Sequence, residues 1–129
     1  MSVKHSPNLH KRRAEGTFHH RPNEVEEFVD HFLSTMCDST RRQILELLTI
    51  PGISDQTPPI EMRSGDIAKA LRLSPATISG HLRQLAETGL ITSRRDGNAI
   101  YYRLRNHVLV RTFKELLHAL DNEHTARKQ

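Results

Sequence analysis

The chain has 129 residues, of which 36% are apolar and 26% charged, so it has room for one small domain with one modest core. A mean hydropathy of -0.59 and the lack of a long apolar run exclude a membrane span, and the length excludes a large multidomain enzyme. The N-terminal stretch offers no apolar segment for a secretory signal, and the one cysteine cannot form an intrachain disulfide, so we expect a reducing, cytoplasmic setting.

The formal net charge of +4 is unevenly distributed along the chain. Residues 1–21 hold five Lys and Arg against one Glu, and the charges of the other 108 residues balance. Within that balanced part, residues 63–105 hold eight Lys and Arg against three acidic residues, whereas residues 24–30 are acidic. Two basic segments are expected of a protein that binds a polyanion, although a charge run is more often a solvated face.

The first half of the chain predicts a polar arm and two helices. Residues 1–22 contain four histidines and no apolar periodicity, which predicts a disordered basic arm. From Asn23, apolar residues at helical spacing predict a helix that ends near Met36. They are Val25, Phe28, Val29, Phe32, Leu33 and Met36. Asp38 fits an N-cap for a second helix over residues 39–49, and Pro51 with Gly52 marks its end.

The second half predicts a loop, two helices, a hairpin and a last helix. Residues 50–62 hold three prolines and read as a loop, with a short strand over 61–63 before Ser64 caps a helix over 65–72. Ser74 and Pro75 suit the N-cap and first position of a helix over 75–88, whose buried stripe is Ile78, Leu82 and Leu85. Residues 90–105 change to a strand period and predict a hairpin with its turn at Asp96-Gly97. A last helix is expected over 106–122, followed by a flexible tail over 125–129.

Helix, short turn, helix and basic hairpin is the element order of a winged helix-turn-helix, a mainly α fold with a small β-hairpin. A helix fits the major groove of DNA, so the outward residues of 75–88 are candidates to contact base edges. They are Ala76, Thr77, Ser79, Gly80, Arg83 and Gln84. On the hairpin, Arg94, Arg95 and Asn98 can reach the backbone or the minor groove. The alternative is that these are ordinary polar surface residues.

Three separated motifs in the right order closely resemble the ArsR/SmtB family of bacterial winged-helix repressors: MCDSTRRQILELL, GDIAKALRLSPATISGHLRQLAETGLI and RRDGNAIYYRL. The resemblance covers residues 33–120, within a winged-helix domain expected over 23–124. It implies a homodimer built on the first and last helices, which represses transcription from an inverted-repeat operator in double-stranded DNA. The implied DNA contacts are Ser74, Thr77, Ser79, His81, Gln84, Arg94 and Arg95. For His81, a partly buried structural role or a phosphate contact fits equally well.

Many members of this family release DNA on binding a metal, so the resemblance raises the question of which residues of this chain could bind one. Cys37 stands alone, and the helix over 65–72 lacks the paired cysteines of the family's arsenic and cadmium sensors. One thiol cannot furnish a three-sulfur site, and the resemblance implies a small buried residue at this position, so we expect Cys37 to be structural rather than sensing.

The last helix offers another candidate metal site, because His107, His118 and Asp121 resemble the family's C-terminal zinc site. The two histidines would lie about 16 Å apart on one helix, so a shared Zn, Ni or Co ion needs an antiparallel helix from a second copy. Arg111 and Lys114 add positive charge to the same face, and solvated surface histidines are the alternative.

Three functions remain open from the residues. The first is a sequence-specific DNA-binding repressor, and the second is a repressor that a divalent metal releases from DNA. The third is a winged-helix module that binds protein through its hairpin and the 50–62 loop. No motif places a nucleophile, a phosphate loop or a carboxylate pair, so we do not expect an enzyme.

Overall fold

A computed structural model of the chain describes residues 20–49 and 60–128, which divide between two units at Asp30 and His31. Helix α2 (Asn23–Met36) begins in the first unit and ends in the second. The other elements belong to the second unit: α3 (Ser39–Leu47), β1 (Met62–Arg63), α4 (Ser64–Leu71), α5 (Pro75–Glu87), β2 (Ile91–Asp96), β3 (Ala99–Leu104) and α6 (His107–Lys128). Most of the expected arm over 1–22 and most of the 50–62 loop lie outside the described residues.

Local capping sets where these helices begin. The side chain of Asp38 accepts a hydrogen bond from the backbone N–H of Arg41 at 3.0 Å, which confirms it as the N-cap of α3. Ser74 caps α5 in the same way, with Pro75 in the first turn. Ser64 was expected to cap the next helix, but it is the first helical residue of α4. Its neighbour Arg63 holds the N-cap position without a side-chain hydrogen bond.

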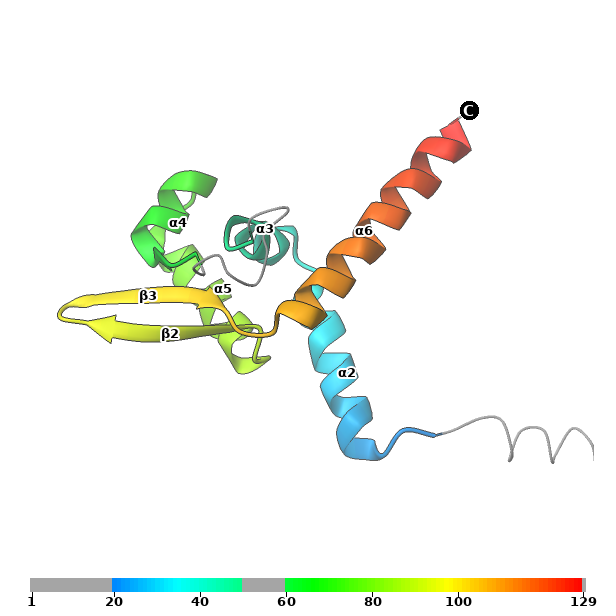
Figure 1. Ribbon diagram of the computed structural model, residues 1–129, viewed down its shortest axis with the longest axis horizontal. Coiled ribbons are helices and arrows are strands. Elements are labelled where there is room, and N and C mark those ends of the chain that lie inside the picture. Colours follow the sequence, from blue (N-terminus) through cyan, green and yellow to red (C-terminus); the bar gives the residue numbers. More distant parts are fainter. Residues whose placement is uncertain (1–19, 50–59, 129) are drawn as a thin grey trace, which may run out of the picture. The chain divides into compact units, whose positions relative to one another are not determined.

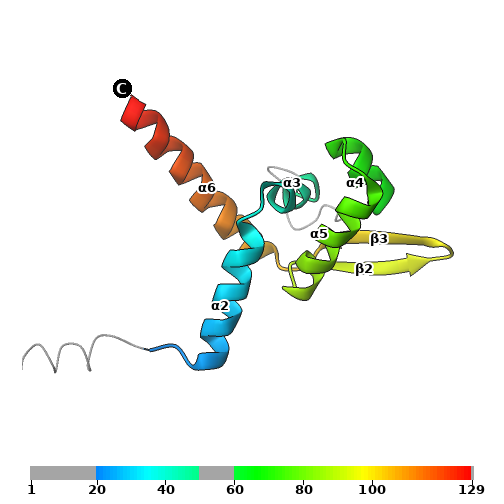
Figure 2. The same ribbon diagram turned by 180° about the vertical axis from the view of Figure 1, so that it is seen from behind.

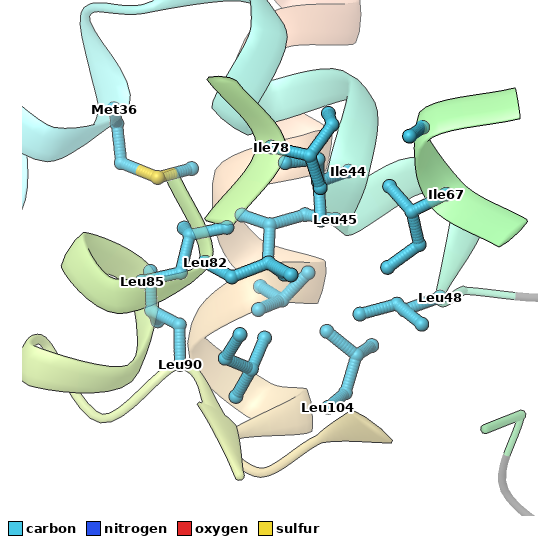
Figure 3. Close-up of a cluster of buried hydrophobic side chains, with 13 residues drawn as sticks. Met36, Ile44, Leu45, Leu48, Ile67, Ile78, Leu82, Leu85, Leu90 and Leu104 are labelled. Atoms are coloured by element: carbon cyan, nitrogen blue, oxygen red, sulfur yellow. The ribbon is translucent and has the colours of Figure 1, made fainter. Parts of the chain in front are cut away.

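The core of the second unit is one apolar cluster to which α3, α4, α5 and the sheet all contribute (Figure 3). The expected stripe of α5 is confirmed, since Ile78, Leu82 and Leu85 are each no more than 1% exposed. They meet Ile44, Leu45, Leu48, Ile67, Leu90 and Leu104, which Figure 3 shows pointing toward one another. Fully burying one such side chain contributes about 1.5–3 kcal/mol, so this cluster fixes α5 against its scaffold.

The three strands form an antiparallel sheet in the order β1-β3-β2, and Figures 1 and 2 show the β2–β3 hairpin beside α5. Asp96 pairs with Ala99, so the two turn residues are Gly97 and Asn98, and the expected turn at Asp96-Gly97 is one residue out of register. Gly97 has φ +63. Asn98 has no positive φ, because Arg72 is the one non-glycine residue with a positive φ in the described part. Glycine with positive φ at the first turn position is typical of a type II′ turn, which matches the strand twist.

Helix α6 is longer than expected and continues through residues 123–128. Asn106 accepts a hydrogen bond from the N–H of Leu109 at 3.1 Å at the start of this helix. The expected end at Asn122 and the tail from residue 125 are wrong. The sequence holds no Gly or Pro there, Arg127 pairs with Glu123 at 3.0 Å one turn earlier, and basic residues in the last turn suit the helix dipole.

No helix in residues 20–49 or 60–128 is long and apolar enough to cross a membrane.

Candidate nucleic-acid interface

The first turn of α5 is built by two hydroxyl groups. The Oγ of Ser74 accepts from the N–H of Thr77 at 3.1 Å and donates its own proton to Thr77 Oγ1 at 2.8 Å. Ser74 therefore uses its only donor and one of its two acceptor lone pairs inside the helix start. The hydroxyl proton of exposed Thr77 remains available to an outside acceptor. Ser74 therefore orients Thr77 for contact.

The outward face of α5 presents a row of exposed side chains opposite its buried stripe. The exposed residues that were expected to contact DNA are Thr77, Ser79, Arg83 and Gln84. Arg83 makes no ion pair within the described part of the chain, so its charge is available to an outside partner. Donors and acceptors on a helix of this width suit the major groove.

His81 lies on the same helix but faces inward, and its side chain is only 19% exposed. Its Nδ1 atom lies 3.4 Å from Nη1 of Arg41 and 4.0 Å from Oδ1 of Asp38, both on the first turn of α3. Of its two expected roles, this position favours the partly buried structural histidine over the phosphate contact. Sequence reasoning missed the contact because 40 residues separate Arg41 from His81.

The two arginines of the hairpin differ in their surroundings. Arg94 Nε donates to Glu61 Oε2 at 2.7 Å, and the guanidinium lies 4.6 Å from the centre of the Tyr101 ring. The hydrogen bond lowers the pKa of Glu61 and raises the pKa of Arg94. Arg95 makes no ion pair with any residue in 20–49 or 60–128. Glu61 was not singled out in the sequence, because only the fold brings it to a residue 33 positions away.

The strand register places these two arginines on opposite faces of the sheet, because neighbouring side chains of a strand alternate. Arg94 is paired with Tyr101, and Arg95 is paired with Ile100. The face of Arg95 also carries Ile91 and Leu104, which are buried in the core. Arg95 therefore lies near the hairpin tip, on the same sheet face that packs against the helices nearer the core.

A groove of about 520 Å³ lies between the start of α4, Ser79 of α5 and the hairpin. Two expected DNA contacts from different elements, Ser79 of α5 and Asn98 of the turn, both line it. The start of α4 closes one side through Arg63, Ser64, Gly65 and Asp66. The structure thus brings residues of α5 and of the hairpin together around one depression.

The candidate metal ligands are less well assembled. His118 and Asp121 line a groove of about 450 Å³ beside Glu46, Arg111 and Lys114, whereas His107 does not line it. No three His, Cys, Asp or Glu side chains in the described part of this single chain are grouped to hold a metal ion. A shared site would need a second copy, so these three ligands stay a prediction. The resemblance implied a small buried residue at position 37, but Cys37 is exposed in this chain.

Similar proteins decide the family. The family profile described as bacterial regulatory protein, arsR family, matches residues 38–93. The transcriptional repressor SdpR of Bacillus subtilis is 35% identical over 81 residues, which cover 63% of this chain and 80% of SdpR. The chain belongs to the ArsR family of bacterial regulatory proteins.

Two further relatives bear on this ArsR-family regulator. An arsenical resistance operon repressor of Staphylococcus aureus is 31% identical over 77 residues, which cover 60% of this chain and 65% of the repressor, just under two thirds of its length. A homodimeric winged helix-turn-helix DNA-binding domain from Mycobacterium bovis, solved by NMR, superposes with a TM-score of 0.63 at 27% identity. The match covers 82% of this chain and 89% of the M. bovis domain.

These findings confirm the expected family, the winged helix-turn-helix fold and the role in transcription regulation. The relatives are regulators, and one of them is named for resistance to a metalloid. The individual DNA-contacting residues stay predictions, which the geometry refines by separating Thr77, Ser79, Arg83, Gln84, Arg95 and Asn98 from the internally engaged Ser74, His81 and Arg94.

Proposed function

We propose that this ArsR-family regulator is a homodimeric repressor that binds an inverted-repeat operator in double-stranded DNA in the bacterial cytoplasm, without catalytic activity. The observation that carries the proposal is the arrangement of α5 and the hairpin. Ser79 of α5 and Asn98 of the hairpin turn line one groove, and the exposed Arg83 and Arg95 belong to the same two elements. A helix that enters the major groove beside a basic hairpin is the docking geometry of this fold.

Exposed apolar side chains support the dimer. In the second unit Leu33, Leu116 and Leu120 are 49–55% exposed, and Val108 is 64% exposed. In the first unit Val25 and Phe28 are 43% and 50% exposed. Large exposed apolar side chains on α2 and α6 are expected to be covered by a partner. The M. bovis domain is homodimeric. A second copy of this chain would bury them.

Binding to the chain's own promoter tests the proposal directly. At equal salt, the dimer is expected to bind promoter DNA at least about a thousandfold more tightly than random DNA of the same length. Equal affinity for both would refute sequence-specific binding. It would instead favour a winged-helix module that binds protein, which should then lose a partner when residues 50–62 are deleted.

Side-chain roles can be separated by two pairs of variants. Thr77→Ala and Gln84→Ala should relax base preference at defined operator positions, because they remove exposed polar groups that are expected to contact base edges. Arg95→Ala should weaken binding to all sequences and reduce the salt slope by about one, because it removes one phosphate partner. Arg94→Ala is the matched control and should change binding less, since Glu61 already occupies that guanidinium.

A divalent metal that loosens the DNA complex is a second candidate function, because His118 and Asp121 line one groove on α6. In an antiparallel pair of α6 helices, His107 of the other copy would complete a Zn, Ni or Co site. His118→Ala should then abolish the metal response while leaving metal-free DNA affinity unchanged. Operator affinity that is unaltered by saturating metal would remove this candidate.

A further inference from the structure

The last turn of α2 contains no basic residue, and two arginines of α3 supply its cap. Arg41 Nε donates to the carbonyl of Thr35 at 2.6 Å, and its Nη2 donates to the carbonyl of Ser34 at 3.4 Å. Arg42 Nη1 donates to the carbonyl of Met36 at 2.7 Å. The last carbonyls of a helix lack partners within it and carry partial negative charge, so two half-buried guanidiniums suit this end.

Of these two arginines, Arg41 also reaches α5. Its Nη1 lies 3.4 Å from Nδ1 of His81, near the middle of that helix. Asp38 accepts from the backbone N–H of Arg41 and lies 4.0 Å from the same imidazole nitrogen. His81 therefore has a partner at the start of α3 in either charge state. Within residues 20–49 and 60–128, no other side chain makes hydrogen bonds to both α2 and α5.

The two helices that Arg41 joins have different parts in the proposed repressor. The exposed row of α5, which includes Thr77 and Ser79, is expected to contact DNA. The end of α2 carries Leu33, which is 49% exposed and which the proposed dimer would bury. In a symmetric dimer the contact between the copies fixes the two α2 helices. The separation of the two α5 helices then depends on how each α5 is attached to the α2 of its own copy.

We propose that Arg41 is a positioning residue for operator recognition. Its guanidinium holds α5 in place relative to the end of α2, and this hold sets the spacing of half-sites that the dimer accepts. The inference rests on the proposed operator binding by a dimer. Half-sites lie one helical turn of about 10–10.5 base pairs apart, so one inserted base pair turns a half-site by about 34–36° around the DNA axis.

Binding to the lengthened operator requires α5 to shift relative to α2. The cost of that shift cannot exceed the free energy of the contacts that hold the two helices together. Without the Arg41 link the cost should fall by the contribution of about one hydrogen bond, which corresponds to roughly three- to tenfold in affinity.

The test compares the affinity of the full chain for its operator with its affinity for the same operator carrying one inserted central base pair. The ratio of these two affinities is the spacing penalty. In Arg41→Gln the spacing penalty should be roughly three- to tenfold smaller than in the wild type. Arg41→Lys keeps the positive charge, but one ammonium cannot replace three guanidinium nitrogens that reach Ser34, Thr35 and His81, so its penalty should shrink as well.

Arg42→Gln is the matched control. It removes a hydrogen bond of similar length from α3 to the end of α2, but Arg42 makes no hydrogen bond to α5. Its stability should fall while its spacing penalty stays at the wild-type value. His81→Ala removes the other end of the link, so its penalty should shrink, and adding Arg41→Gln should change it no further.

Three results would overturn the inference. The first is a wild-type spacing penalty in Arg41→Gln. The second is an equal loss of the penalty in Arg42→Gln, because the arginines would then act only by stabilising the end of α2. The third is a His81→Ala protein that binds both DNAs more weakly by the same factor, which is the behaviour of a direct phosphate contact.

Urea unfolding without DNA separates this inference from the proposed function. At fixed protein concentration, the stability loss of the double variant Arg41→Gln with His81→Ala should be smaller than the sum of the two single losses. The losses of Arg42→Gln and His81→Ala should add. Additive losses for Arg41 and His81 refute the link even if the operator is bound. A wild type that shows no preference for its promoter refutes the proposed function and the positioning role with it, whereas the contact between Arg41 and His81 is decided in urea alone.

Discussion

Gly80 gives a sharp test of whether the outward face of α5 approaches DNA. It stands inside the helix, where glycine costs about 0.5–1 kcal/mol relative to alanine. A Cβ added at Gly80 would meet no atom within 4 Å, and its φ is not positive, so neither packing nor backbone strain offsets that cost. Gly80→Ala should therefore raise the free energy of unfolding by about 0.5–1 kcal/mol.

The same methyl group should harm function. It would project from the surface that bears Ser79 and Arg83, where the helix backbone must come close to base edges, so we expect operator affinity to fall. Urea unfolding at fixed protein concentration measures stability, with an unchanged m-value as the check of two-state behaviour. Fluorescence anisotropy with operator DNA measures binding.

Ala86→Gly on the same helix is the control, and it should lower stability without altering base preference. A Gly80→Ala protein that is more stable and binds its operator as tightly as the wild type would refute the placement of this face on DNA.

Three further changes test other parts of the structure. Glu61→Gln should release Arg94, raise affinity for all DNA sequences and steepen the salt dependence by about one in a salt titration. Ile78→Ala should cost about 3 kcal/mol in urea unfolding, because the side chain is 0% exposed in the core. The backbone N–H of Arg41 holds the pKa of Asp38 below its usual 3.8, so its charge stabilises the fold fully above that pH and progressively less below it. The stability advantage of wild type over Asp38→Asn should accordingly shrink as unfolding is measured at falling pH, and a constant difference would contradict the capping role.

Local patterns predicted those features that depend on neighbours in the chain. The 3.6-residue spacing of Ile78, Leu82 and Leu85 predicted both the helix and its buried face, because a helix has to bury an apolar stripe wherever it packs. Asp38 and Ser74 were predicted as caps because a cap acts within three residues. The hairpin turn was misplaced by one residue, since both Asp96-Gly97 and Gly97-Asn98 are good turn dipeptides and only the pairing of the strands chooses between them.

Contacts between distant residues were not predictable in this way. Nothing near His81 in the sequence indicates that it faces Arg41. A contact from His81 to a DNA phosphate fitted its position in the helix equally well. Cys37 was expected to be buried on the strength of a family resemblance, yet the single chain leaves it exposed. Burial of a side chain depends on which elements cover it, and that is decided by tertiary packing.

The basic surplus of residues 63–105 illustrates how pairing changes the meaning of a charge count. Those residues hold eight Lys and Arg against three acidic residues, which reads as a uniformly positive surface. In the fold, Arg63 pairs with Asp66 at 3.4 Å, and Arg94 pairs with Glu61 from outside that segment. Arg83 and Arg95 make no such pair within 20–49 and 60–128, and they belong to the two elements that border the groove of Ser79 and Asn98. Lys69, Arg72, Arg103 and Arg105 also make no ion pair within the described part, so we expect only part of the attraction for phosphate to lie beside the predicted base contacts.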